Sequence, residues 1–157
     1  MSNNVAFITG ISGQDGGHLA ELLLSKNYIV HGMTRRNSDF DTSRFTEDEN
    51  NRIFLHYGDM SDGSRLGNLI SKIRPDEVYN LACTPDVMVS FQCPEYTCEI
   101  AGLGTVKLLE ACKNLDKPVR YYQAGSSEMF GNNCNDMGFQ DESTSFDPQS
   151  PYAVAKV

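Results

Sequence analysis

Short apolar segments typical of β-strands alternate with helical patterns along most of this chain. Between these segments, apolar residues recur at the three- and four-residue spacing of amphipathic helices. The expected strands are Val5–Ile8, Tyr28–Met33, Arg52–Tyr57, Glu77–Leu81 and Val119–Ala124. Strands that alternate with helices form a parallel sheet, because the helices supply the crossover connections. The pattern therefore predicts an α/β fold, built as a doubly wound parallel sheet in one domain.

Two helices can be placed with some detail. One has Ser61 or Asp62 as its N-cap, ends before Pro75, and carries apolar residues on one side: Leu66, Leu69, Ile70 and Ile73. Another is expected over Glu99–Asn114, although Gly102 and Gly104 each weaken a helix by about 1 kcal/mol relative to Ala. Close packing against another element would explain these glycines.

A long irregular segment separates Gly131 from Pro151. It lacks both helical and strand periodicity, which predicts a loop. Long loops inside a compact domain are usually functional or disordered, and this one directly precedes Tyr152. We interpret it as a loop around a functional site and not as a linker between domains.

Composition excludes several classes of protein. The 157 residues, 39% of them hydrophobic, suffice for one core, and a net charge of −8 argues against general binding to nucleic acid or anionic membranes. The five cysteines lack a CxxC pair and a histidine pair at metal-ligand spacing, so we expect free thiols and no metal site. No signal peptide is recognised, and the apolar runs are too short to cross a bilayer. These features favour a cytoplasmic protein.

A glycine-rich segment follows the first strand and opens a helix, as a dinucleotide-binding turn does. Glycines at positions 10, 13 and 16 let the backbone approach a pyrophosphate, whose charge is met by N–H groups at the helix N-terminus. Their spacing departs from the strict G-x-G-x-x-G fingerprint, so a turn without a ligand remains an alternative. The candidate cofactor-binding residues here are Thr9, Gly10, Ser12, Gly13, Gln14, Asp15 and Gly16.

Two arginines follow the second strand, within the segment Thr34–Ser38. At this position an NAD-binding domain carries an acidic residue for the ribose hydroxyl, whereas guanidinium groups suit a 2′-phosphate. Arg35 and Arg36 therefore favour NADP over NAD, with solvated surface arginines as the alternative. Asp59, directly after the third strand, is placed to accept a hydrogen bond from the adenine amino group, or to cap a turn.

The last strand and the last helix carry candidate acid–base residues. Ser126 and Glu128 follow the strand, where Ser126 could bind a substrate oxygen and Glu128 could move a proton, or both could belong to a solvated turn. Tyr152 and Lys156 share one helix face, because residues four apart are neighbours there. A cation beside the phenol lowers its pKa, and a tyrosinate can take the proton of a sugar hydroxyl while a hydride leaves to a nicotinamide. This spacing is common by chance, and only its order after the other motifs makes it specific.

These stretches, in this order, resemble the N-terminal, cofactor-binding part of the extended short-chain dehydrogenase/reductase family, which includes epimerases and dehydratases. Within it they are most similar to the GDP-mannose 4,6-dehydratases. The resemblance covers essentially the whole chain and implies a Rossmann-like fold and bound NADP. It is carried by 8–16, 30–36, 55–59, 78–82, 95–97, 127–128 and 150–152, and it adds as cofactor-binding residues Met60, Leu81, Ala82, Tyr96, Tyr152 and Lys156.

The resemblance also implies a reaction, the conversion of GDP-mannose to GDP-4-dehydro-6-deoxy-mannose. Tyr152 would deprotonate the C4 hydroxyl while NADP⁺ accepts the C4 hydride, and Lys156 would hold the cofactor ribose and tune Tyr152. Glu128 would remove the C5 proton, so that water leaves from C6, where the stored hydride returns. Ser126 stands where the family places a hydroxyl near the C4 oxygen.

The single Glu128 favours the GDP-mannose enzymes, because 4-epimerases need no residue for elimination and glucose-type dehydratases have an Asp-Glu pair. Several residues depart from the family pattern around the pocket, which leaves a related nucleotide sugar as an alternative substrate. Ser126 replaces a threonine, Phe130 a tyrosine, Met88 a lysine, and Cys83–Asp86 an Ala-Gln-Ser-His segment.

The family binds its hexose nucleotide largely through a C-terminal region, and the sequence stops at Val157. We therefore expect an incomplete Rossmann domain over 1–157 without the later strands and the substrate domain, with little activity alone. The expected partners are a nucleotide sugar, a complementing C-terminal half and possible further copies of the chain. The alternatives are a noncatalytic NADP-binding module and a nucleotide-sugar 4-epimerase.

Overall fold

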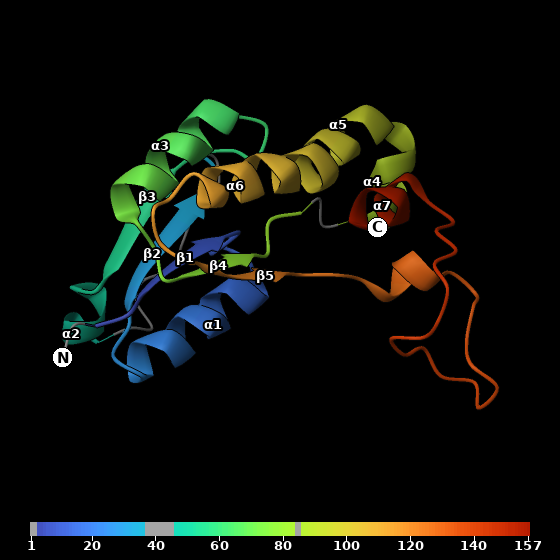
Figure 1. Ribbon diagram of the computed structural model, residues 1–157, viewed down its shortest axis with the longest axis horizontal. Coiled ribbons are helices and arrows are strands. Elements are labelled where there is room, and N and C mark those ends of the chain that lie inside the picture. Colours follow the sequence, from blue (N-terminus) through green and yellow to red (C-terminus); the bar gives the residue numbers. More distant parts are fainter. Residues whose placement is uncertain (1–2, 37–45, 84–85) are drawn as a thin grey trace.

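The computed structural model describes residues 3–36, 46–83 and 86–157, and its centre is a five-stranded sheet in the order β3-β2-β1-β4-β5 (Figure 1). All neighbouring strands run parallel. Their carboxyl ends therefore meet at one edge. The strands are β1 (Val5–Thr9), β2 (Ile29–Thr34), β3 (Ile53–Tyr57), β4 (Glu77–Asn80) and β5 (Arg120–Gln123). The predicted strands and the predicted Rossmann-like fold are confirmed, with strand ends that differ by at most one residue.

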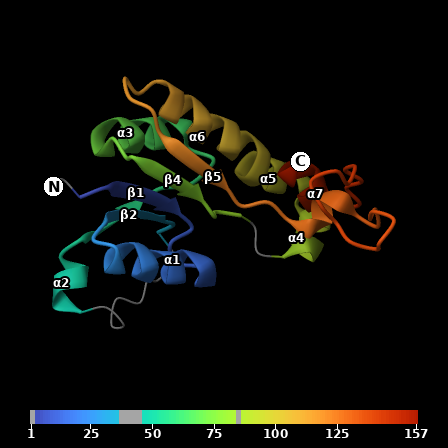
Figure 2. The ribbon, with the colours of Figure 1, turned by 60° about the horizontal axis from the view of Figure 1, so that its bottom comes forward.

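Helices cover both faces of the sheet (Figure 2). Helix α1 (Gln14–Ser25) lies on one face, where its Leu24 joins a buried cluster with Ile8 of β1. Helices α3 (Gly63–Ile73) and α6 (Gly104–Lys113) lie on the other face and enclose Phe7 of the same strand. Successive strand residues point to opposite faces, so a strand covered on both sides is apolar throughout. Each fully buried aliphatic or aromatic side chain stabilises the fold by roughly 1.5–3 kcal/mol.

Helix α3 begins and ends at chemically defined residues. Asp62, one of the two predicted N-caps, accepts a hydrogen bond from the backbone N–H of Arg65 at 2.8 Å. After Ile73, the C-cap residue Arg74 adopts a left-handed conformation with φ of 52°, and Pro75 follows. A short helix, α2 (Glu47–Asn50), precedes β3 and begins with a capping box, in which Thr46 is the N-cap.

The helix expected over Glu99–Asn114 is part of a longer helical run, so its predicted start is wrong. Helix α5 (Pro94–Cys98) continues through a π-helical turn, η1 (Glu99–Leu103), into α6. Another unpredicted helix, α4 (Val87–Gln92), lies before α5 and has Asp86 as its N-cap. Both helices are too short for their apolar residues to show a helical period. Pro94 stands at the N1 position of α5, where proline is common.

Close packing explains one of the two glycines in this run. A Cβ atom on Gly104 would lie 2.8 Å from the Cβ of Met60, which is closer than side-chain carbons approach. A Cβ on Gly102 would meet only the carbonyl oxygen of Ala155, at an ordinary 3.7 Å. The close approach of α6 to the segment after β3 therefore requires Gly104 but not Gly102.

After β5 the chain forms a 3₁₀ turn, η2 (Ser127–Phe130), and reaches α7 (Pro151–Lys156) through 131–150, which contain no helix or strand. The predicted loop is confirmed. It is tied back by the backbone N–H of Asp147, which donates to the carbonyl of Met129 at 3.0 Å. Helix α7 packs against α4, α5, η1 and η2, beyond the carboxyl ends of the strands (Figure 1).

The five cysteines are free thiols in the structure, as predicted. In 3–36, 46–83 and 86–157, no helix combines the length and the apolar character that a membrane span requires. Within the same residues, no three His, Cys, Asp or Glu side chains are grouped as metal ligands.

Gly16→Ala tests the tight packing of the glycine-rich turn. The added Cβ would lie 2.4 Å from the carbonyl oxygen of Gly10 and 2.7 Å from the Cα of Ile11, and neither backbone atom can move away. We expect the free energy of unfolding in urea to fall by roughly 1–3 kcal/mol. The matched control is Gly67→Ala in α3, where a Cβ has no atom within 4 Å. This change should raise the free energy of unfolding by roughly 0.5–1 kcal/mol, and equal effects of the two would contradict the packing argument.

A pair of histidines on β2 and β3 makes stability depend on pH. His31 Nδ1 and His56 Nε2 lie 2.9 Å apart, and burial, with His56 nearby, lowers the pKa of His31 to about 4. Burial and the charges of Arg65 and Lys72 on α3 lower the pKa of His56 as well. An unfolded histidine takes up a proton near 6.5 and folded His31 only near 4, so protons favour the unfolded chain between these values.

We therefore expect the free energy of unfolding to be highest above pH 6.5 and to fall as the pH drops towards 4. Denaturant titrations across this range measure the loss. His31→Gln should flatten the pH dependence, because it removes the imidazole whose pKa is lowered and leaves an amide that can still form hydrogen bonds. An unchanged pH profile in the variant would show that other groups cause the loss.

Candidate cofactor and catalytic site

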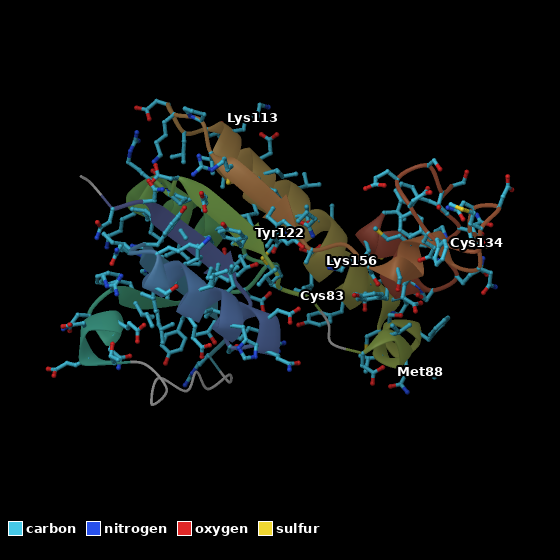
Figure 3. All side chains as sticks on the ribbon, turned by 90° about the horizontal axis from the view of Figure 1, so that it is seen from below. Cys83, Met88, Lys113, Tyr122, Cys134 and Lys156 are labelled. Carbon is cyan, nitrogen blue, oxygen red and sulfur yellow. The ribbon has the colours of Figure 1, made fainter. Side chains whose placement is uncertain are left out.

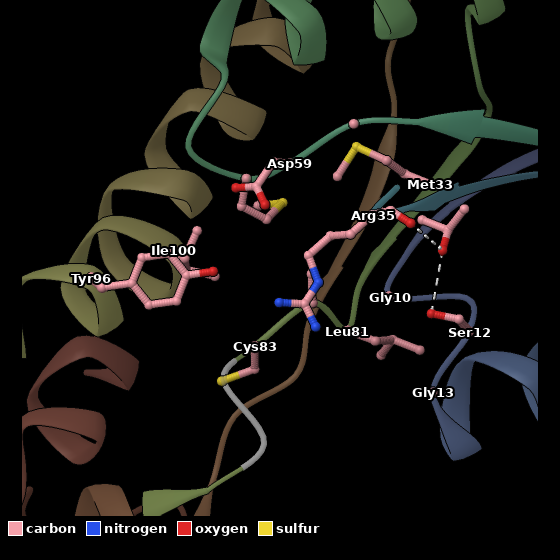
Figure 4. Close-up of a pocket in the computed structure, with 14 residues that line it drawn as sticks. Gly10, Ser12, Gly13, Met33, Arg35, Asp59, Leu81, Cys83, Tyr96 and Ile100 are labelled. Atoms are coloured by element: carbon pink, nitrogen blue, oxygen red, sulfur yellow. Dashed lines mark hydrogen bonds between the residues drawn. The ribbon is translucent and has the colours of Figure 1, made fainter. Parts of the chain in front are cut away.

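A pocket of about 490 Å³ opens where the strands end (Figure 4). Its walls come from the segments that follow β1, β2, β3 and β4, and from α5 and η1. This position is where doubly wound sheets bind their ligands. The lining residues are Gly10, Ser12, Gly13, Met33, Thr34, Arg35, Gly58, Asp59, Met60, Leu81, Ala82, Cys83, Tyr96 and Ile100.

Most of the predicted cofactor-binding residues line this one pocket, although they come from distant parts of the sequence. They are Gly10, Ser12, Gly13, Arg35, Asp59, Met60, Leu81, Ala82 and Tyr96. The others lie below the pocket, at the helix N-terminus or beside it, and do not line it: Thr9, Gln14, Asp15, Gly16, Arg36, Tyr152 and Lys156.

Thr9 supports the pocket from beneath. Its side chain is fully buried and donates to Asn80 Oδ1 at 2.5 Å, while its oxygen accepts the backbone N–H of Ala82 at 3.2 Å. These bonds fasten the segment after β4 to the end of β1. The contribution of Thr9 to a cofactor site is therefore structural.

The glycine-rich turn has the geometry of an anion cradle. Gly10 has a φ of 72°, in the left-handed region that glycine favours, and a Cβ there would lie 3.0 Å from the backbone nitrogen of Ala82. Gly13 is the N-cap of α1, and no side chain among the described residues caps this helix. Gln14 and Asp15 are exposed in its first turn. Backbone N–H groups at the start of α1 are thus available to a pyrophosphate.

The two predicted arginines are arranged differently. The guanidinium of Arg35 extends into the pocket, between Asp59, Cys83 and Tyr96 (Figure 4). Arg36 instead lines a second, more open hollow of about 400 Å³. Arg35 lines both, so the hollow adjoins the pocket. The rest of the arginine segment, residues 37 and 38, lies outside the described residues.

Asp59 lines the pocket and also forms a turn. Its Oδ1 accepts hydrogen bonds from the backbone N–H of Ser61 at 2.9 Å and from the Ser61 hydroxyl at 2.7 Å. The turn-capping role left open by the sequence is therefore present. A contact with adenine stays a prediction.

Two other predicted catalytic residues, Ser126 and Glu128, interact with the phenol of Tyr152. Burial is the largest effect and raises the pKa of Tyr152; the adjacent Cys83 thiol and the Glu128 charge raise it further, while a hydrogen bond with Ser126 lowers it. Ser126 also accepts the backbone N–H of Glu128 at 3.2 Å, which fixes the two relative to each other. Helix α7 is anchored by Ser150, whose side chain caps it. Tyr152 and the side chains around it thus bring together three separate segments of the chain: the ends of β4 and β5, and α7.

The pKa of Tyr152 is raised, whereas the sequence predicted that a neighbouring cation lowers it; the tuning of the phenol by Lys156 stays a prediction. The Lys156 Nζ donates to the carbonyl oxygen of Ala124 at 2.7 Å and lies 5.9 Å from the centre of the Tyr152 ring. Burial and the Cys83 thiol raise the pKa of Tyr152 by more than the hydrogen bond with Ser126 lowers it. The ammonium group is held at the end of β5, on the same side as the phenol.

In the sequence, Cys83 stood out only as a departure from the family pattern around the pocket, and it was missed that this residue connects the two parts of the site. It lines the pocket, and its thiol lies beside Tyr152. Its position directly after Leu81 and Ala82, at the end of β4, could have indicated it. Ile100 was missed because it points into the pocket from the unexpected π-helical turn.

The comparison with protein families gives a decisive match. The model of the family described as GDP-mannose 4,6 dehydratase matches residues 7–157. The chain belongs to the GDP-mannose 4,6-dehydratase family. The resemblance inferred from its motifs is confirmed.

Curated members of the family match almost all of this chain. A GDP-mannose 4,6-dehydratase of Yersinia enterocolitica is 49% identical over 160 residues, which are 97% of this chain and 42% of the relative. GDP-mannose 4,6 dehydratase 2 of Caenorhabditis elegans is 51% identical over 164 residues, 98% of this chain and 42% of the relative. The chain thus spans less than half the length of these relatives.

Solved structures share the fold. UDP-glucose 4-epimerase of Thermus thermophilus, in complex with NAD, superposes with a TM-score of 0.82 at 23% identity, over 97% of this chain and 47% of the epimerase. Pal from Bacillus thuringiensis has a TM-score of 0.82 at 27% identity, over 97% of this chain and 48% of its own. The Rossmann-like arrangement is therefore common to proteins of distant sequence.

Two substitutions should move the pKa of Tyr152 in opposite directions. Glu128→Gln removes a negative charge that disfavours tyrosinate, so the pKa falls, whereas Ser126→Ala removes a hydrogen bond that favours it, so the pKa rises. NMR titration of tyrosine labelled with ¹³C follows the phenol, and Tyr152→Phe identifies its signal among the seven tyrosines. Shifts of the same sign in both variants would contradict the arrangement.

Proposed function

We propose that this chain supplies the NADP-binding and acid–base part of a GDP-mannose 4,6-dehydratase site. The observation that carries the proposal is the convergence of Ser126, Glu128 and Tyr152 beside a glycine-lined pocket at the strand ends. Membership of the family indicates which reaction this arrangement serves. GDP-mannose is the nucleotide sugar named for the relatives.

A nicotinamide dinucleotide fits the residues present. The turn at Gly10 has no room for a side chain, and the uncapped start of α1 offers N–H groups for a pyrophosphate. Leu81 and Ile100 provide apolar wall for flat rings. Arg35 and Arg36 favour NADP over NAD because permanently charged guanidinium groups match a 2′-phosphate. Held by these residues, the cofactor would supply the hydride chemistry of the reaction, as acceptor from sugar C4 and as donor to C6.

Each acid–base residue has a distinct task in this proposal. Tyr152 removes the proton of the C4 hydroxyl, and Ser126 donates a hydrogen bond to the C4 oxygen. Glu128 takes the proton from C5 and gives it to the C6 hydroxyl, which leaves as water; when hydride adds at C6, a proton from solvent through Glu128 returns to C5. Because the pKa of Tyr152 is raised, its deprotonation requires additional positive charge, which Lys156 would supply by moving closer than its present 5.9 Å from the ring centre.

The remainder of the sugar site is proposed to come from a complementing C-terminal part. Strand β5 ends the sheet in the described residues, and a further strand could pair with its outer edge.

A second copy of the chain is proposed to pack on an apolar stripe of η1 and α6. In this stripe Leu103 and Val106 are each 54% exposed and Leu109 is 43% exposed.

The reaction is tested with GDP-mannose and NADP⁺, using product analysis by mass. We expect little or no turnover from the 157-residue chain alone, because catalysis needs the sugar aligned with both cofactor and base. We expect dehydration to be restored when a second polypeptide is added: the region of the Yersinia enterocolitica relative that this chain does not match. In that mixture Glu128→Gln should slow elimination about 100-fold.

Robust turnover by the chain alone would contradict the dependence on a complementing part. An epimerised sugar, with Glu128→Gln still active, would favour a 4-epimerase. Saturable NADP⁺ binding without any turnover in the mixture would indicate a noncatalytic module.

Cofactor preference is tested by calorimetric titration with NADP⁺ and NAD⁺. We expect tighter binding of NADP⁺, and Arg35→Ala should weaken it about tenfold or more while NAD⁺ binding changes little, because a charge-assisted bond to phosphate is lost. Lys113→Ala, which removes an exposed charge near the end of α6 (Figure 3), is the control. Equal affinities for the two cofactors would contradict the assignment of NADP.

A further inference from the structure

The second hollow combines residues from three elements. Beside the pocket, Arg35 and Arg36 come from the end of β2, Tyr57 and Asp59 from the end of β3, and Arg65 from the first turn of α3. The hollow has a volume of about 400 Å³, is open to solvent, and is lined mainly by charged residues. Arg65 is the one guanidinium here that the motifs of the sequence did not indicate.

Arg65 is held in place by the backbone around it. Its Nε donates to the carbonyl oxygen of Tyr57 at 2.8 Å, and its backbone N–H donates to Asp62 Oδ1 at 2.8 Å. The side chain is half-buried. Within the described parts of the chain, no hydrogen bond or ion pair engages its two terminal nitrogens. The fork of the guanidinium is therefore oriented before a ligand arrives, which reduces the entropy lost on binding.

The charges in the hollow favour an anion. Three guanidinium groups face two carboxylates, and each carboxylate already accepts a hydrogen bond from a backbone N–H: Asp59 from Ser61, and Asp62 from Arg65. The hollow therefore carries more positive than negative charge, and backbone hydrogen bonds already engage both of its carboxylates. A phosphate monoester has oxygens for several donors and suits the planar fork of arginine.

We propose that Arg65 binds the 2′-phosphate of NADP together with Arg35 and Arg36, and is a residue that selects NADP over NAD. The inference rests on the proposed function, because it takes the adenosine end of NADP to lie between Arg35 and Asp59. The phosphate would bridge two elements, the end of β2 and the start of α3. Arg65 contributes the donor whose direction is already set by Tyr57.

The inference is tested with 2′,5′-ADP and 5′-AMP, which differ only in the 2′-phosphate. Calorimetric titration should show that Arg65→Ala weakens 2′,5′-ADP about tenfold, the effect of one charge-assisted contact, while 5′-AMP changes less than about twofold. Arg65→Lys should fall between the wild type and Arg65→Ala, because it keeps the charge without the fork. Lys72→Ala, a charge in the last turn of the same helix, should leave both affinities unchanged. Thermal unfolding of each variant reports whether the fold is kept.

The outcomes separate this inference from the proposal on which it rests. If the wild type prefers 2′,5′-ADP and Arg65→Ala keeps the full preference, the role of Arg65 is overturned and NADP binding stands. If Arg65→Ala weakens both nucleotides equally, Arg65 shapes the pocket and does not bind the phosphate, so the inference is again overturned. If the wild type shows no preference, the assignment of NADP fails, and this inference fails with it.

Discussion

The hydrogen bond between Thr9 and Asn80 lies at the point on which the site depends. Asn80 is buried, and its amide also donates to Gln123 at 2.9 Å and to Thr105 at 3.2 Å. One side chain thereby joins the ends of β1, β4 and β5 to α6. Buried polar groups lose little when fully paired and cost roughly 1–3 kcal/mol each when a partner is removed. This network fixes the ends of the strands relative to one another. It therefore also fixes the positions of the turn at Gly10 and of the segment that carries Cys83.

The pocket and the cluster around Tyr152 depend on different kinds of structure. Most of the pocket is built from residues at or directly after the strand ends, whose positions follow from the sheet itself, and Tyr96 and Ile100 are added from α5 and η1. Tyr152 arrives from a distant helix at the end of a long loop, and its place depends on contacts of α7 with α4 and α5. Cys83 lies where the two meet. The geometry of proton transfer is thus less directly determined by the sheet than the geometry of cofactor binding.

Features that depend on local spacing could be predicted from the sequence, and those that depend on packing could not. The strands, the turn at Gly10 and the N-cap at Asp62 follow from patterns within a few residues. The short helix α4 shows no such period. The direction of the pKa of Tyr152 also could not be predicted, because it is decided by burial and by Cys83, which lies far away in the sequence. Arg65 was not recognised for a similar reason: no motif joins the start of α3 to the end of β2.

The position of β1 between β2 and β4 has a consequence for how the chain acquires its fold. As the ribosome releases the chain, β1 emerges before both of its neighbouring strands, and one of them begins only at Glu77. Pairings over such separations form slowly, because the loop between the strands must close before the contacts can stabilise it. During that delay Phe7 and Ile8, fully buried in the finished protein, remain open to other chains. The most protected strand of the fold is therefore also the segment that is longest at risk of aggregation during synthesis.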